Sequence, residues 1–97
     1  MIRVAPLKVD NRIVTGLKVE LPDSPPLLMI IGETGFIMCG FLNIDAAEQA
    51  NVAAAMVCGV KNFDDMLKAE IKAATSRAQS KGITYGIRGK EAIKLLL

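Results

Sequence analysis

Two apolar runs near the middle of the chain limit its fold more than any other feature of the sequence. They span residues 27–31 and 36–42 and flank the glycine-rich tetrapeptide at residues 32–35. Each run has the length of a strand, and the tetrapeptide between them favours a tight turn. Continuous apolar runs are typical of strands that are covered on both faces. The sequence therefore predicts a hairpin at the centre of a sheet.

A second predicted hairpin precedes the central one. Residues 2–9 and 12–21 form strands joined at Asp10-Asn11, residue types that tolerate the positive backbone angles of a tight turn. Pro6 has no N–H to donate to a neighbouring strand, which places the first strand at an edge of the sheet. A proline-rich exposed loop follows the hairpin.

The second strand of this hairpin alternates between apolar and charged residues. Leu17, Val19 and Leu21 alternate with Lys18 and Glu20. Neighbouring side chains of a strand point to opposite faces of the sheet. We therefore expect the three apolar side chains to face the core and the two charged ones to face solvent.

The residues after the central hairpin predict a crossover between two parallel strands. Asn43 or Asp45 can cap a short helix over residues 46–53, and residues 54–60 return to a strand. A strand, helix and strand in this order connect parallel neighbours in a sheet. We therefore expect residues 36–42 and 54–60 to pair in parallel.

The C-terminal third predicts two helices. Asn62 caps a helix over residues 63–81 that ends at Gly82, and Ala69 marks a place where this helix could break. The inner face of the helix follows from apolar residues at helical spacing: Phe63, Met66, Leu67, Ile71, Ala74 and Ala78. The second helix, residues 90–97, is too short to be stable alone, so it must dock through Ile93, Leu96 and Leu97.

These elements predict the α+β class. We expect one domain over residues 1–97, with a mixed sheet of about four to five strands and two to three helices packed on it. Hydrophobic residues make up 52% of the chain, yet only three Phe and one Tyr are aromatic, so aliphatic and methionine side chains must build the core. A chain this small has a high ratio of surface to volume and cannot easily bury so much apolar surface as a monomer. We therefore expect a homo-oligomer.

The charge and the lack of long apolar segments limit the partners and the compartment. The net charge of +2 is too small for general attraction to nucleic acid or to anionic membranes. The apolar runs fall short of the roughly 20 residues that cross a bilayer, and the N-terminus lacks a signal pattern. We expect a cytoplasmic protein with free thiols, without a membrane or nucleic-acid partner.

Cys39 is the best candidate for chemistry. It lies in the predicted central strand, immediately before Gly40, which could admit a ligand close to the sulfur, while Asn43 could place a polar group at the mouth of a pocket. The chain has no histidine, so a cation or a helix N-terminus would have to activate the thiol. The structural alternative is that Cys39 is a small buried hydrophobic residue without reactivity.

Cys58 repeats the Met38-Cys39-Gly40 pattern in the segment Met56-Val57-Cys58-Gly59. Parallel neighbouring strands could bring the two sulfurs together as a redox pair. Two cysteines nineteen positions apart do not make a four-ligand zinc site, however, and no histidine adds to them. We therefore expect no metal and no cofactor.

The segment 86–90 could hold an anion. Gly86, Arg88, Gly89 and Lys90 precede a predicted helix, so backbone amides and two cations could bind a phosphate. The spacing is not that of a phosphate loop, and it meets only the minimal GXXG of a KH domain. A solvated turn is the simpler interpretation.

Four groups of residues carry a resemblance to a known family. They are Gly35 to Gly40, Gly59-Val60, Asn62 to Leu67, and Gly82-Ile83 with Gly86, Gly89 and Glu91-Ala92. On these residues the chain resembles the YunC-like family of small uncharacterised bacterial and archaeal proteins, over nearly its whole length. The resemblance implies a compact α/β domain and brings no established activity, substrate or catalytic residue. Cys39 stands at the cysteine of the family's Met-Cys-Gly motif, whereas Cys58 matches none of its motifs.

Three hypotheses about function remain. The first is a self-associating binding or structural module, and it rests on the aliphatic excess, the modest charge and the lack of a catalytic set. The second is a thiol-dependent enzyme or a small-ligand sensor that uses Cys39. The third is nucleotide or RNA binding through Arg88 and Lys90.

Overall fold

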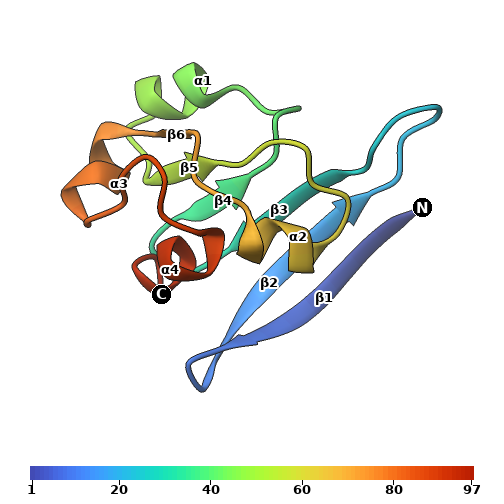
Figure 1. Cartoon of the computed structure of the whole chain (residues 1–97), viewed down its shortest axis with the longest axis horizontal. Coiled ribbons are helices and arrows are strands. Elements are labelled where there is room, and N and C mark those ends of the chain that lie inside the picture. The colour runs from blue at the N-terminus through green and yellow to red at the C-terminus, as the bar shows by residue number, and fades with distance from the viewer.

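The strands of the sheet follow one another in chain order, so the chain builds the sheet from one edge to the other (Figure 1). The computed structural model describes all residues, 1–97. Only β4 and β5 are parallel, and every other neighbouring pair is antiparallel. The strands are β1 (Ile2–Val9), β2 (Arg12–Val19), β3 (Leu27–Ile31), β4 (Phe36–Met38), β5 (Ala54–Met56) and β6 (Ala73–Ala74). The helices are α1 (Ile44–Gln49), α2 (Phe63–Lys68), α3 (Ser76–Ser80) and α4 (Gly89–Lys94).

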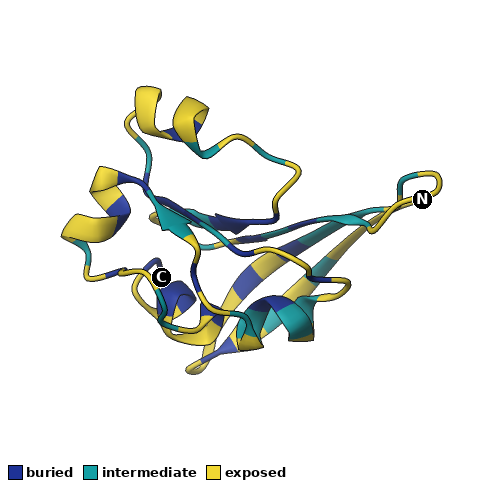
Figure 2. Ribbon diagram, turned by 45° about the horizontal axis from the view of Figure 1, so that its top comes forward, coloured by how far each residue is buried: buried dark blue, intermediate teal, exposed yellow.

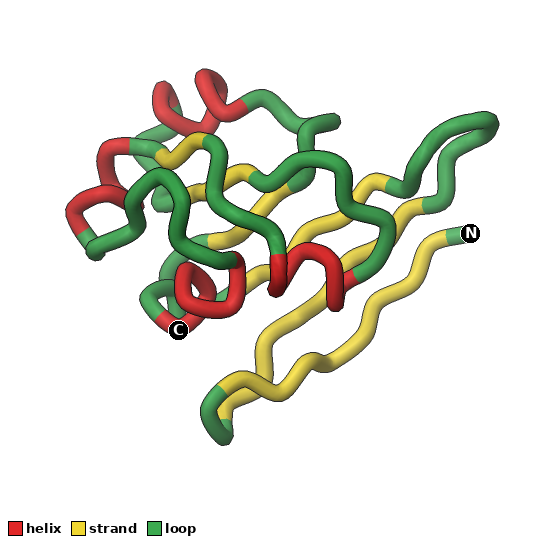
Figure 3. Tube along the Cα trace, viewed as in Figure 1, coloured by secondary structure: helices red, strands yellow, loops and turns green.

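The predicted α+β class with a mixed sheet is confirmed, and the element counts are higher than expected. The sheet has six strands rather than four or five, and there are four helices rather than two or three. Figure 3 shows how short β5 and β6 are beside β1 and β2. A strand of two residues such as β6 has too few positions for a period-two pattern, so the sequence gives no sign of it.

The β1–β2 hairpin turns at the predicted residues. Asp10 and Asn11 have φ angles of 48° and 65°, and Val9 pairs with Arg12 across this two-residue loop. β1 forms an edge of the sheet, as Pro6 predicted.

The Pro6 nitrogen points away from β2. The Glu20 N–H donates to the Met1 carbonyl at 3.0 Å, and hydrogen-bonded pairs alternate along an antiparallel ladder. The hydrogen-bonded pairs therefore contain every second residue of β1, counted from Met1. Pro6 falls between two of them, so the pair of Pro6 and Thr15 carries no ladder hydrogen bond. The open edge of β1 therefore lacks a donor at its middle.

The buried face of β2 is the opposite of the one expected. Val14 and Gly16 are buried, whereas Leu17 and Val19 are half-buried on the other face and Lys18 lies half-buried on the inner face. The reason is Gly16, because a Cβ there would lie 2.8 Å from Phe63 Cζ. Without a side chain at this position, the Phe63 ring packs directly onto the strand, and this contact favours the Val14 and Gly16 side as the one that faces the helices.

The crossover between β4 and β5 has the predicted parallel pairing, with shorter elements. β4 ends at Met38 rather than at residue 42, and β5 ends at Met56 rather than at residue 60. The helix between them, α1, covers Ile44–Gln49 rather than residues 46–53. The Asn43 side chain caps α1 by accepting from the N–H groups of Asp45 and Ala46.

The single helix expected over residues 63–81 is wrong, because the chain leaves the helix at Ala69. Asn62 caps α2 as predicted, but Ala69 has an extended ψ of 150°. The next residues join the sheet, where the Lys72 N–H donates to the Met56 carbonyl at 2.8 Å. α3 then begins after Thr75, and Gly82 with a φ of 100° follows its end.

Helices cover the two faces of the sheet unequally (Figure 2). α2 and α4 lie on the inner face, where the main core contains the buried side chains of Leu28, Ile30, Ile37, Met66, Ile71, Ile93 and Leu96. α1 alone lies on the outer face, over β4 and β5, where Met38, Ala47 and Ala54 form a small second cluster. The outer side of β3 was expected to be covered, but Met29 is only half-buried there and Ile31 is exposed.

The C-terminal helix docks on the inner face as predicted. α4 covers Gly89–Lys94 rather than residues 90–97, and Ile93 and Leu96 are fully buried. None of the four helices is long and apolar enough to cross a lipid bilayer.

Candidate functional site

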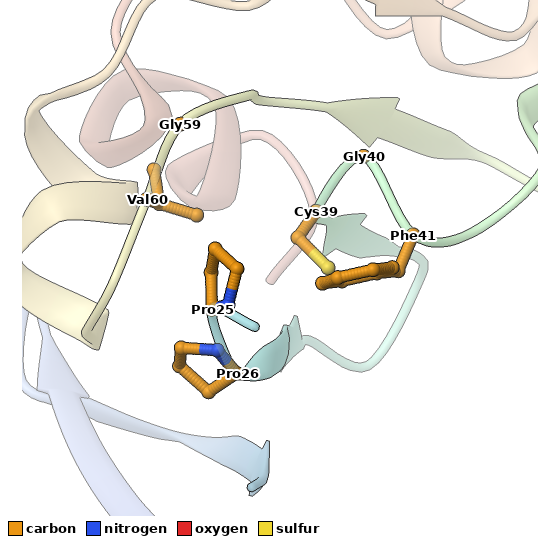
Figure 4. A pocket seen from close by; sticks show the side chains of 7 residues that line it. All are labelled: Pro25, Pro26, Cys39, Gly40, Phe41, Gly59 and Val60. Atoms are coloured by element: carbon orange, nitrogen blue, oxygen red, sulfur yellow. The ribbon is translucent and has the colours of Figure 1, made fainter. Parts of the chain in front are cut away.

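A hollow opens where β4 ends, and Cys39 lines it. Its volume is about 220 Å³, and its lining residues are Pro25, Pro26, Cys39, Gly40, Phe41, Gly59 and Val60. In Figure 4 the side chains of Cys39 and Phe41 lie on one side and those of Pro25, Pro26 and Val60 on the other. The hollow thus lies at the carboxyl ends of two parallel strands, with two prolines from the loop before β3 opposite them.

The Cys39 sulfur takes part in the ladder between β3 and β4. The Cys39 N–H donates to the Leu28 carbonyl at 3.1 Å, but the Leu28 N–H donates to the Cys39 sulfur at 3.3 Å. The Cys39 carbonyl accepts instead from the Leu42 N–H in a turn. The sulfur therefore occupies the place of a strand carbonyl, which lets the chain turn away from the sheet at Gly40.

The surroundings of Cys39 supply no activating group. The side chain is only 3% exposed, and no charged residue lines the hollow. A nucleophilic thiol requires a neighbouring base, cation or helix N-terminus. The observed hydrogen bond agrees with a structural role for this sulfur.

Cys58 is an exposed free thiol. The register pairs Met38 with Met56, so Gly40 lies beside Cys58, and a Cβ on Gly40 would lie 3.7 Å from the Cys58 sulfur. Val57, opposite Cys39, is fully buried, and its successor Cys58 points the other way. The parallel strands do bring the two segments together, as the sequence suggested, but both cysteines are free.

The other candidate residues lie apart from this hollow or are already engaged. The Asn43 side chain is occupied in capping α1. Arg88 donates to the Lys68 carbonyl at 2.6 Å, so its guanidinium holds the C-terminal end of α2. Lys90 is exposed beside a separate depression that Asp10 and Asp64 also line.

A surface that sequence analysis did not locate lies on the outer face of β1, β2 and β3. Alternation along the strands and the pairing register place eleven side chains there, and we call them the outer patch: Ile2, Val4, Pro6, Lys8, Ile13, Thr15, Leu17, Val19, Leu27, Met29 and Ile31. Leu27, at the margin of the patch, also packs against the main core. Ile2, Val4 and Ile13 are 69%, 66% and 66% exposed. The apolar excess of the sequence signalled that such a surface exists, but not where it lies.

The fold and the hollow define a small α+β domain in which a Met-Cys-Gly segment follows the first strand of a parallel crossover. Residues 38–96 match the family described as Domain of unknown function (DUF1805), and the chain belongs to this family. The Uncharacterized protein YunC of Bacillus subtilis (strain 168) is 27% identical to this chain over 97 aligned positions, and the alignment covers 96% of this chain and 95% of YunC.

A solved structure shares the fold over the whole chain. It is the crystal structure of TA1206 from Thermoplasma acidophilum, a protein of unknown function. The TM-score is 0.94 at 33% identity, and the match covers 100% of this chain and 94% of TA1206. The resemblance to YunC-like proteins is thereby confirmed.

Native-state alkylation is expected to modify Cys58 and to leave Cys39 intact. With only 3% of Cys39 exposed, reagent reaches it only when the end of β4 opens, so its rate should be at least about 100-fold lower. Mass spectrometry of peptides after timed iodoacetamide treatment measures both rates. A Cys39 that reacts as fast as Cys58 would instead favour a thiol-dependent activity.

Proposed function

We propose that this domain is a self-associating binding module whose working surface is the outer patch. The observation that carries the proposal is an apolar face on three neighbouring strands that no helix of the same chain covers. A contiguous exposed apolar surface on a small domain marks an interaction site rather than ordinary surface. The proposed compartment is the cytoplasm, where two free thiols stay reduced.

The energy available from the patch is of the same order as the cost of association. Fully burying an exposed aliphatic side chain contributes about 1.5–3 kcal/mol, so the two-thirds exposed Ile2, Val4 and Ile13 offer on the order of 1–2 kcal/mol each. Two copies together offer roughly 6–12 kcal/mol, against an association cost of about 4–15 kcal/mol. The half-buried Leu17, Val19 and Met29 add to the favourable side, so we expect an association that dissociates on dilution.

The purified chain is expected to form a species of at least twice its 10.4 kDa mass at about 100 µM, and to dissociate on dilution. Size-exclusion chromatography with light scattering over a dilution series measures the mass directly. High salt should strengthen rather than weaken the association, because the patch is apolar. A monomer at every concentration would refute the proposed function.

A second candidate function is binding of a small ligand in the hollow beside Cys39. The observation in its favour is the position of the hollow at the carboxyl ends of the parallel strands β4 and β5, where open α/β sheets place their ligand sites. Pro25, Phe41 and Val60 make its lining largely apolar, which suits a small apolar molecule. A thiol-dependent enzyme at this site additionally requires a reactive Cys39. The alkylation rate of Cys39 therefore separates a thiol-dependent enzyme from a site that only binds a ligand.

A further inference from the structure

We infer that two copies of this chain pack face to face through their outer patches, with the two-fold axis running along β2 and with α1 of each copy against the β1 edge of the other. This inference rests on the proposed function and adds the geometry of the assembly. The partner is a second copy of the same chain, and the interface is a sandwich of two sheets.

The side chains of the outer patch form apolar rows across the strands. The register aligns Ile2 with Val19 and Leu27, and Val4 with Leu17 and Met29. The only charged residue among the eleven positions is Lys8, near the hairpin end. Self-pairing of this face therefore brings no like charges together at its centre, which is the requirement for a symmetric interface.

Pairing through the edge of the sheet is disfavoured by Pro6. Its nitrogen faces the open side of β1 and carries no hydrogen, so a strand added there loses a bond at the middle. The opposite edge, β6, has only two residues. The apolar faces therefore remain as the surface on which two copies can meet.

The size of the outer patch agrees with a modest dimer interface. Strands of eight, eight and five residues, at about 3.3 Å per residue and about 4.8 Å between strands, present a flat area of roughly 330 Å². Standard interfaces bury about 800 Å² of accessible surface per partner, and protruding side chains make the accessible area larger than the flat one. Contacts made by α1 with the partner add to this area.

α1 determines which symmetry axis is allowed. The helix stands on the outer face over β4 and β5, next to the outer patch (Figures 1 and 2). A helix is about 10 Å thick, which equals the spacing of two packed sheets, so α1 lies at the level of the partner's sheet. A two-fold axis across the strands would place the two α1 helices on each other.

An axis along β2 removes this clash. The rotation then carries the partner's α1 beyond the β1 edge of the first copy, and the strands of the two sheets run in the same direction. Each α1 thereby covers the open edge of the other copy's β1. The assembly thus buries the outer patch and the β1 edge of each copy, and both are exposed in the single chain.

The first test is substitution within the outer patch. Ile13→Lys is expected to raise the dissociation constant by at least about 100-fold, since it buries an unpaired charge in the dimer. Because Ile13 is 66% exposed in the single chain, the variant should keep its circular dichroism spectrum and thermal stability. The matched control is Tyr85→Lys, which alters a 72% exposed side chain outside the patch and should leave the dissociation constant unchanged.

The second test locates the axis by cross-linking in a Cys58→Ser background. Arg3→Cys places a thiol on β1, and Ala46→Cys places one on α1. A short bismaleimide is expected to link these two variants when they are mixed, and to link neither to itself. Ala46→Cys chains that link to each other would overturn the proposed axis.

The outcomes separate this geometry from the proposed function. If the wild type associates but Ile13→Lys associates equally well, self-association stands and the face-to-face geometry is wrong. If the wild type remains a monomer at about 100 µM, the proposed function fails together with this inference.

Discussion

Gly89→Ala is expected to lower the free energy of unfolding by about 3 kcal/mol or more. A Cβ at this position would overlap the Met66 carbonyl oxygen and lie 3.0 Å from its carbonyl carbon and 3.3 Å from Leu67 Cα. All three atoms belong to the backbone of α2, so no side-chain rotation can relieve the overlap. The Gly89 N–H also donates to the Ala69 carbonyl at 2.8 Å, which fixes the start of α4 against the end of α2.

The size of the loss follows from the role of α4. Forcing α4 away from α2 disturbs the packing of the fully buried Met66, Ile93 and Leu96 at once. Overpacking of this kind costs about 3 kcal/mol or more, out of a total stability on the order of 5–15 kcal/mol. Thermal denaturation followed by circular dichroism should show a melting temperature lowered by at least about 12 °C.

Gly40→Ala is the matched control for this prediction. A Cβ at Gly40 meets only the Cys58 sulfur, at an ordinary contact distance of 3.7 Å. The expected change in the free energy of unfolding is less than about 1 kcal/mol. Equal destabilisation by the two substitutions would show that loss of glycine itself, and not the overlap with α2, is responsible.

Thr75→Val is the second substitution with a large expected effect. The Thr75 hydroxyl donates to the Val52 carbonyl at 2.7 Å and accepts from the Ala54 N–H at 3.0 Å and the Ala78 N–H at 3.3 Å. The side chain is 1% exposed, so no water replaces these bonds in the native state. Valine has nearly the same shape and leaves a buried acceptor and buried donors unpaired.

We expect Thr75→Val to lower the free energy of unfolding by about 3 kcal/mol, because each orphaned buried group costs about 1–3 kcal/mol. Urea denaturation measures this loss from the shift of the midpoint. Thr75→Ser keeps the hydroxyl and removes only a methyl group, so it should lose about 1 kcal/mol. A valine variant as stable as the serine variant would mean that the hydroxyl does not join β5 and α3 as described.

Local signals made much of the fold predictable. Asn43 and Asn62 cap the helices that follow them, and Asp10-Asn11 forms the turn of the first hairpin. Pro6 marks the edge strand, because a missing N–H excludes an interior position whatever the neighbours are. These features depend on one residue type and its nearest neighbours in the chain.

The candidate site was predictable in part. The apolar run around Cys39 correctly suggested that this residue is buried, although the strand ends one residue before it, at Met38. The crossover correctly placed Cys58 on the neighbouring segment. The hydrogen bond from the Leu28 N–H to the Cys39 sulfur had no sequence signal. It depends on the register between β3 and β4, and many registers fit two apolar runs.

By itself the sequence determined the α+β class, the two hairpins, the parallel crossover, the helix caps and the family, since each follows from local residue types or from motifs along the chain. Only the tertiary structure decided that residues 72–75 extend along β5 and that the Val14 and Gly16 side of β2 is buried. β2 has apolar residues on both faces, so its pattern alone cannot select one. The Phe63 ring, from α2, packs against Gly16 and thereby leaves Ile13 and Leu17 on the outer patch.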